Sequence, residues 1–454
     1  MSEKRSSFTS KIGFVLAAAG SAVGLGNLWR FPYLAAKYGG GMFILIYIIL
    51  ALTFGFALMI AEIALGRKTG QSAINAYAKL NKNCAFFGII NSLVPIIITP
   101  YYCVIGGWVL KFLWSYITMP AAAVAATNEA GLTLFEQLIT STTSPILWFL
   151  LFLLFTIMVI LIGVDKGIEK CSTFLMPILV LLVAIVAIYA CTLPGAFDGV
   201  KYLIKPNLKD FSAITVLAAM TQLFFSLSLA MGIMITYGSY MKKNTDIETS
   251  TWQIEAFDTG VAFLAALAII PAIFAVGDPS NLKAGPSLMF IILPQLFAIM
   301  PFGRVIAILF FFLVFFAAIT SSISLYETVV SIVCDKAKAK RNTGIIVTFF
   351  ICLVIGLLSS LGYGPLNNVT IIGMQFLDLF DFLSNNVLMP IAALCTCIFV
   401  GFIIKPKAII EEVELSGKFR WKKLFTIVIK YVAPIIIIII LITSILQGLG
   451  VLKV

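Results

Sequence analysis

The sequence of 454 residues contains no histidine. Histidine changes charge near neutral pH and is the commonest metal ligand, so its absence excludes histidine proton relays, histidine-bound metals and Ser-His or Cys-His catalysis. The eight cysteines lie mostly in apolar runs and lack the paired doublets of a zinc site. We interpret them as small packing residues. With no metal cluster and no nucleophile–base pair, the sequence argues against an enzyme.

Charged residues are scarce as well. They make up 11% of the chain, whereas a soluble domain carries about 25%. Hydrophobic residues reach 61%, and the mean hydropathy is +1.08. Apolar runs recur at the length of about 20 residues that a helix needs to cross a bilayer, without the alternation typical of a membrane barrel. We therefore predict an all-α integral membrane protein.

The basic residues exceed the acidic ones, for a net charge of +11. Their positions argue against nucleic-acid binding, because most lie in segments expected on the cytoplasmic side, as the positive-inside rule requires. The connection 120–144 contains no Lys or Arg, which is typical of an external loop. The polar, basic start of the chain does not have the form of a cleavable signal. These features predict a multi-pass protein of the lipid bilayer with a cytoplasmic N-terminus.

One apolar segment carries groups that a regular membrane helix does not need. The stretch from Gly20 to Pro32 contains three glycines and the polar residues Asn27 and Arg30. Glycine in a helix interior costs about 1 kcal/mol relative to alanine, and polar groups at membrane depth are rare and usually functional. An unwound turn would free carbonyls to bind a cation and amides to bind an anion. We predict a broken helix that forms half of a binding site.

The segment Phe224–Gly232 repeats this chemistry, with two serines and a glycine near mid-span. The two breaks fall at similar places in successive groups of five helices, which is the pattern of inverted repeats with a site at their interface. We predict eleven transmembrane helices: two inverted five-helix repeats, with helices 1 and 6 discontinuous, and then helix 11. The predicted organisation is a cytoplasmic tail (1–10), a first repeat (11–193), an extracellular loop (194–211), a second repeat (212–404), a cytoplasmic loop (405–423) and helix 11 (424–454).

The residues Gly-Leu-Gly-Asn-Leu-Trp-Arg-Phe-Pro-Tyr at 24–33 resemble the neurotransmitter:sodium symporter family, whose bacterial members import amino acids. The resemblance covers nearly the whole chain. It extends to Glu62 with Gly66-Arg67, Tyr101-Tyr102, Phe225-Ser226-Leu227-Ser228, Thr320-Ser321-Ser322 and Leu377-Asp378-Leu379-Phe380-Asp381. It implies a fold of the leucine-transporter type, sodium-coupled symport by alternating access, and a place in the bacterial inner membrane. Family members commonly have twelve helices, and shorter bacterial members resemble the eleven predicted here.

The resemblance implies two sodium ions, which as hard cations prefer oxygen ligands. The first site would use the Ala22 carbonyl and the side chains of Asn27, Ser226 and Asp258. The second would use the carbonyls of Gly20, Val23 and Ala317 and the hydroxyls of Thr320 and Ser321. Judged from the residues alone, a Ser or Thr in a span more often bonds to its own helix.

Asp258 departs from many relatives, including chloride-dependent ones, which have asparagine there. A carboxylate beside sodium supplies a fixed negative charge that would replace a bound chloride. Ala262 also lacks a group to hold the anion. We predict chloride-independent transport. The alternative for Asp258 is a helix-capping or paired aspartate.

The resemblance also implies a substrate pocket. The substrate carboxylate would meet the amides of Leu25 and Gly26 and the Tyr102 hydroxyl, near the positive end of a half-helix. The pocket would be lined by Ser21, Ala22, Leu25, Gly26, Ile98, Tyr102, Phe225, Ser226, Ser228, Met231, Ser322 and Leu325. Because none of these is charged, we expect a neutral, hydrophobic L-amino acid, with tyrosine, tryptophan or phenylalanine favoured. For Met231 and Leu325 alone, the alternative is ordinary core packing.

Charge pairs predict two gates. Arg30 and Asp381 would face each other across the outer vestibule, above Tyr102 and Phe225. Arg5 and Asp335 would close the cytoplasmic side, assisted by Tyr240. Arginine suits a bidentate bond to a carboxylate, although Arg5 and Asp335 alone would equally be surface charges.

The sequence also bears on two other classes of function. A channel would need a continuous polar lining and repeated filter elements, which the sequence lacks. A sensor with a transporter fold, binding an amino acid without moving it, stays open. The sequence also leaves open whether the protein is a monomer or a homodimer.

Overall fold

The structure is a computed structural model that describes residues 7–276 and 287–448. Within these ranges the regular structure is helical, and the only β-bridges are two isolated ones, Thr127–Thr133 and Ile371–Met374. Nine helices in the described ranges are long and apolar enough to cross a membrane, and a pair bent by 54°, Lys11–Ala22 and Gly26–Lys37, brings the number to ten. The all-α membrane architecture is thus confirmed.

The helices are labelled α, and short 3-10 or π-helical turns are labelled η. The first half contains α1 (Lys11–Ala22), η1 (Gly26–Arg30), α2 (Phe31–Lys37), α3 (Gly41–Leu50), η2 (Ala51–Gly55), α4 (Phe56–Thr69), α5 (Ala73–Leu80), η3 (Lys82–Cys84), α6 (Ala85–Thr118), α7 (Ala121–Ala125), α8 (Leu134–Thr140), α9 (Ser144–Ile162), η4 (Val164–Glu169) and α10 (Lys170–Thr192). The second half contains α11 (Ala196–Ile204), η5 (Leu208–Asp210), α12 (Ala213–Ser226), α13 (Ile233–Ser239), α14 (Ile247–Val276), η7 (Leu288–Ile292), α15 (Leu293–Ile299), α16 (Gly303–Ala337), α17 (Arg341–Leu361), α18 (Phe376–Asp381), η8 (Phe382–Leu388), α19 (Met389–Ile398), η9 (Phe399–Ile403), α20 (Lys405–Glu414), α21 (Lys422–Ile427), η10 (Val428–Val432) and α22 (Ala433–Gly448).

Helix 1 is broken where the glycines predict it. Ser10 caps α1 by accepting a hydrogen bond from the Gly13 amide at 2.9 Å, and the helix ends at Ala22. The chain resumes as η1 at Gly26. The Asn27 side-chain oxygen accepts from the Gly24 amide at 3.0 Å. This bond satisfies a backbone donor that the break removes from the helical ladder, as a buried amide requires.

Helix 6 is broken between α12 and α13. Three residues in the gap have positive φ: Ser228 at 52°, Ala230 at 58° and Gly232 at 69°. This conformation costs a residue with a side chain about 1–2 kcal/mol, so the turn needs outside support. Glu62 of α4 gives it by accepting from the Ala230 amide at 2.9 Å. The halves α12 and α13 correspond to the discontinuous helix 6 of the prediction, and the count of eleven spans stays a prediction.

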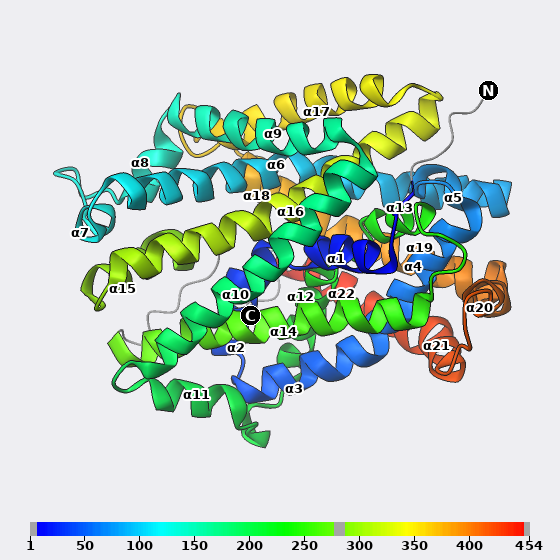
Figure 1. The fold of residues 1–454 in the computed structure, drawn as a ribbon, viewed down its shortest axis with the longest axis horizontal. Helices are drawn as coiled ribbons and strands as arrows, with labels where there is room; N and C mark the ends of the chain where they lie inside the picture. The colour runs from blue at the N-terminus through cyan, green and yellow to red at the C-terminus, as the bar shows by residue number, and fades with distance from the viewer. Residues whose placement is uncertain (1–6, 277–286, 449–454) are drawn as a thin grey trace.

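The broken helix α1 lies in the middle of the bundle, with α10, α14 and α16 packed around it (Figure 1). The short helices α7, α8 and α15 lie at one end of the molecule, whereas α5, α20 and α21 lie at the other (Figure 1). The two helix breaks therefore lie between these two ends of the molecule, and neither end exposes them directly.

Candidate functional site

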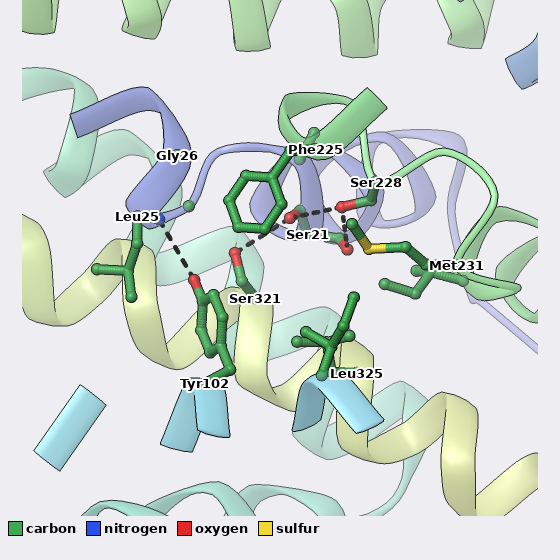
Figure 2. A pocket seen from close by; sticks show the side chains of 13 residues that line it. Ser21, Leu25, Gly26, Tyr102, Phe225, Ser228, Met231, Ser321 and Leu325 are labelled. Atoms are coloured by element: carbon green, nitrogen blue, oxygen red, sulfur yellow. Dashed lines mark hydrogen bonds between the residues drawn. The ribbon is translucent and has the colours of Figure 1, made fainter. Parts of the chain in front are cut away.

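The two helix breaks are bonded to each other. The Ser21 and Ser228 hydroxyls lie 3.2 Å apart, and the Ser228 hydroxyl also donates to the Ser21 carbonyl at 3.0 Å. Figure 2 shows this contact at the edge of a pocket, with Phe225 beside it. Segments 207 residues apart in sequence thus form one polar surface inside the bundle.

Three residues predicted for the first sodium site form a buried cluster. The Asn27 amide donates to the Asp258 carboxylate at 2.7 Å and contacts the Ser226 hydroxyl at 3.0 Å. Ser226 donates to the two carboxylate oxygens at 2.9 and 3.1 Å. All three side chains are at most 1% exposed. Ala22, the fourth predicted ligand, lines the adjacent pocket. The cluster offers oxygen atoms and one carboxylate, a donor set that suits a hard monovalent cation.

Two further residues at this cluster were not predicted from the sequence. The Tyr47 hydroxyl donates to Asp258 at 2.8 Å, from helix α3. Glu255 lies on α14, three positions before Asp258 and so on the same helix face. It is 2% exposed, and among the described residues neither of its carboxylate oxygens has a hydrogen-bond partner. Asp258 thus belongs to a larger buried polar region than the motif indicates.

The residues predicted for the second sodium site converge between α1 and α16. The Ser321 hydroxyl lies within 3.3 Å of the Gly20 carbonyl oxygen and 3.4 Å of the Val23 carbonyl oxygen. The Thr320 hydroxyl contacts the Ala317 carbonyl at 3.2 Å. Ser321 thus joins α16 to Gly20 and Val23, whereas the Thr320 hydroxyl bonds within its own helix.

A small cavity of about 20 Å³ lies between the two breaks. Leu25 and Tyr102 lie at one end of it, and Met231 and Leu325 at the other (Figure 2). The Leu25 amide donates to the Tyr102 hydroxyl at 3.3 Å. The cavity is lined by Ser21, Ala22, Gly24, Leu25, Gly26, Ile98, Tyr102, Phe225, Ser228, Met231, Ile233, Ser321 and Leu325. An amino acid needs more room, so binding requires these side chains to move.

Most of the predicted substrate residues line this cavity, but Ser226 and Ser322 lie elsewhere. Ser226 faces Asp258. The Ser322 hydroxyl lies 2.8 Å from that of Thr156 on α9. Successive helical residues point about 100° apart, so Thr320, Ser321 and Ser322 cannot all face one site. Three residues line the cavity although the sequence did not predict them as substrate contacts: Gly24, Ile233 and Ser321. Of these, Gly24 lies within the family motif, so its place at the cavity could have been predicted.

A second cavity, of about 350 Å³, lies outside the first. Leu25, Tyr102 and Phe225 line both, so they separate the two. Arg30 and Asp381 also line the outer cavity, but in the described part of the chain no ion pair joins them. The Arg30 guanidinium lies 5.6 Å from the centre of the Phe225 ring, and Asp381 accepts from Asn385 at 2.6 Å. The predicted charge pair is thus placed at one vestibule without direct contact.

The side of the bundle that the sequence predicts to be cytoplasmic is closed by several layers. Phe8 is buried against Tyr237 and Tyr240, and its amide donates to the Tyr240 carbonyl at 3.1 Å. The Tyr240 hydroxyl donates to Glu327 at 2.8 Å, which Arg341 also binds with two nitrogens. Asp335 accepts from the Ser72 amide at 2.7 Å. Arg5, the predicted partner of Asp335, lies outside the described residues. The Glu327–Arg341 pair was not anticipated from the sequence.

Glu169 anchors the start of α1. Its carboxylate accepts from the Thr9 amide at 2.7 Å, the Thr9 hydroxyl at 2.6 Å and the Ser10 hydroxyl at 2.9 Å. Glu169 ends η4, the irregular turn that begins helix 5. A Cβ atom on Gly13 would overlap this carboxylate, so any larger residue there would have to displace Glu169. The contact links the ends of helices 1 and 5.

We expect Gly13→Ala to weaken sodium-dependent ligand binding by about tenfold. The added methyl must displace Glu169, and losing one charged hydrogen bond costs about 1.5 kcal/mol, which is roughly a factor of ten. Gly260→Ala is the matched control, because a Cβ there meets no atom within 4 Å. The measurement is a sodium titration of ligand binding for the two variants. Equal affinities in both would contradict the role of Glu169.

Comparison with known proteins agrees with this geometry. A model of the sodium:neurotransmitter symporter family matches residues 5–130 and 133–450. The chain is 35% identical over 447 residues to the uncharacterized sodium-dependent transporter YhdH of Bacillus subtilis, covering 97% of this chain and 98% of that protein. It is 32% identical over 454 residues to an uncharacterized sodium-dependent transporter of Haemophilus influenzae, with coverage of 97% and 98%.

The fold is also similar to a solved structure, that of MhsT in complex with L-phenylalanine. The TM-score is 0.87 and the sequence identity is 36%, covering 97% of this chain and 100% of MhsT. The relatives are transporters, which confirms that the chain is not an enzyme. The chain belongs to the sodium:neurotransmitter symporter family and is a sodium-coupled membrane transporter.

Proposed function

We propose that the protein imports a neutral, hydrophobic L-amino acid with sodium, independently of chloride. The observation that carries this proposal is the contact between two unwound turns, which line one buried cavity, while Asn27 and Ser226 of the same turns bind Asp258. Unwound turns at mid-membrane bind small ions and zwitterions with backbone groups that a regular helix uses in its own hydrogen bonds.

Two sodium ions are assigned to the two oxygen clusters. The first would lie among Ala22, Asn27, Ser226 and Asp258, next to the cavity that would hold the substrate carboxylate. The second would lie among Gly20, Val23, Ala317, Thr320 and Ser321. Both clusters join an unwound or terminal part of helix 1 to another helix. Sodium at either place would therefore stabilise the arrangement that binds substrate, and thereby couple the ion to the amino acid.

Asp258 supports chloride independence. Its carboxylate already accepts bonds from Asn27, Ser226 and Tyr47. A fixed negative charge at this depth does the electrostatic work that a bound anion would otherwise do. Ala262, one turn further along α14, offers only a methyl group. Transport in gluconate should therefore match transport in chloride.

The cavity chemistry supports an aromatic or branched substrate. No charged side chain lines it, and its far end is formed by Met231 and Leu325. Methionine adapts its shape and contacts aromatic rings favourably. The solved relative MhsT was crystallised with L-phenylalanine, which agrees with this choice. The substrate carboxylate would take the place of the bond between the Leu25 amide and Tyr102.

The cavities also support alternating access. Leu25, Tyr102 and Phe225 form a thin partition on the outer side, with Arg30 and Asp381 beyond it. The cytoplasmic side carries the thicker closure around Phe8, as far as the described residues reach. We therefore assign the outer gate to the thin partition and the inner gate to the cytoplasmic layers, including Tyr240 and Asp335. We place the protein in a bacterial inner membrane, with its N-terminus in the cytoplasm.

A competition experiment tests the substrate assignment. Purified protein is given labelled L-phenylalanine in sodium gluconate, together with an excess of each unlabelled amino acid. We expect displacement by phenylalanine, tyrosine, tryptophan and leucine, and none by aspartate or lysine, because the cavity lining offers no charge to pair with theirs. Displacement by a charged amino acid, or by none of the hydrophobic ones, would contradict the assignment.

A further inference from the structure

A groove of about 390 Å³ opens on the outside of the bundle, where α6, α9, α10 and α16 meet. Its lining is apolar and largely aromatic, and it includes Trp114, Trp148, Val159, Leu175, Phe316 and Ile319. Trp114 is 54% exposed, so the groove is open to its surroundings. The groove is far larger than the ~10–15 Å³ of such space that one water molecule needs.

The groove is about as long as one membrane leaflet is deep. On α9 its lining runs from Trp148 to Val159, which at 1.5 Å per residue is about 16 Å. The hydrocarbon core of a bilayer is about 30 Å thick. The groove begins four residues after the start of α9 and ends three residues before its end, so it crosses the middle of this span. A single acyl chain lying along α9 from Trp148 would thus extend past the middle of the membrane.

A cation stands beside the groove, next to the ring of Trp148. The Lys111 ammonium lies 5.6 Å from the centre of the Trp148 ring. Lys111 is half-buried and belongs to the span Lys82–Thr118. None of the ion pairs in the described ranges involves Lys111. A lysine stem lies along apolar surface while its charge reaches toward the interface, where tryptophan is enriched. An anionic headgroup complements this charge.

We propose that the groove binds one anionic phospholipid, with an acyl chain along α9 and the phosphate on the Lys111 ammonium. The acyl chain of the lipid contacts the apolar walls of the groove. The phosphate, through Lys111, makes the site prefer an anionic lipid. The site is separate from the amino-acid cavity, because the two share no lining residue. It does not depend on which amino acid is transported.

Native mass spectrometry of the purified full chain tests this. The protein in detergent is given equimolar phosphatidylglycerol and phosphatidylcholine with matched acyl chains. We expect one phosphatidylglycerol to be retained about fivefold over phosphatidylcholine, as one lysine contributes near a lipid surface. Lys111→Gln should remove the preference, while Lys209→Gln, at an exposed position outside the groove, should keep it. Val159→Phe, which fills the inner end, should reduce retention of both lipids.

Each arm has an outcome that overturns the proposal. Equal retention of the two lipids by the unaltered protein would mean ordinary surrounding lipid only. An unchanged preference in Lys111→Gln would place the anionic site elsewhere, whether or not Val159→Phe folds. Displacement of the lipid by millimolar inorganic phosphate would show a headgroup site without a bound acyl chain.

Discussion

Asp258→Asn should raise the sodium concentration needed for half-maximal ligand binding by about 100-fold. Asp258 carries the charge of the Asn27–Ser226–Asp258 cluster, and it is completely buried. Removing one charged partner from a buried site costs about 3 kcal/mol or more, which is roughly 100-fold in affinity. The measurement is equilibrium binding of labelled L-phenylalanine over a range of sodium concentrations, with gluconate as the anion.

Asp378→Asn is the matched control for this substitution. Asp378 lines the outer vestibule and accepts from the Tyr363 hydroxyl at 2.7 Å, away from both proposed sodium sites. It should leave the sodium dependence within about twofold of the unaltered protein, since one exposed hydrogen bond contributes little. If Asp258→Asn kept the original sodium dependence, Asp258 would be a structural aspartate and the first sodium site would need other ligands.

Glu62→Ala should abolish sodium-dependent binding and lower the thermal midpoint. Glu62 is fully buried and holds the Ala230 amide at 2.9 Å, between two residues with positive φ. Leaving that amide without an acceptor costs about 1–3 kcal/mol, and the cavity left by the side chain adds a similar loss. Together these terms would weaken the binding conformation by roughly 100-fold or more.

Glu62→Gln separates the hydrogen bond from the charge. The glutamine side chain keeps a carbonyl oxygen that accepts from Ala230 and has nearly the same volume. We expect it to bind ligand within about tenfold of the unaltered protein and to melt at a similar temperature. If the alanine and glutamine variants lost binding equally, the proposal that this hydrogen bond stabilises the unwound turn would be wrong.

The breaks were predictable because their signals are local. Glycines at 20, 24 and 26, with Asn27 among them, weaken a helix at one place, and the family motif adds the roles of its residues. Phe225 and Ser228 were predictable for the same reason, because they belong to the second break and to the family resemblance. The structure places Gly24, Gly26, Phe225 and Ser228 at the cavity. Gly20 lies against Thr320, and Asn27 lies against Asp258.

The partners of the motif were not predictable in the same way. Tyr47 reaches Asp258 across 211 residues, and Glu169 reaches Thr9 across 160. Nothing in the sequence near Tyr47 or Glu169 marks them, because each lies in an ordinary apolar or turn segment and gains its role only from packing. Ser322 was predicted to line the substrate pocket, next to Thr320 and Ser321 of the second sodium site. The helical rotation turns its hydroxyl toward Thr156 on α9.

Uptake into proteoliposomes tests the central claim most directly. Labelled L-phenylalanine is supplied outside vesicles that contain the purified protein, with an inward sodium gradient and gluconate as the only anion. The account predicts accumulation above the outside concentration, lost when sodium is equal on both sides. Sodium-dependent binding without accumulation would identify a sensor, and accumulation that requires chloride would contradict the role given to Asp258.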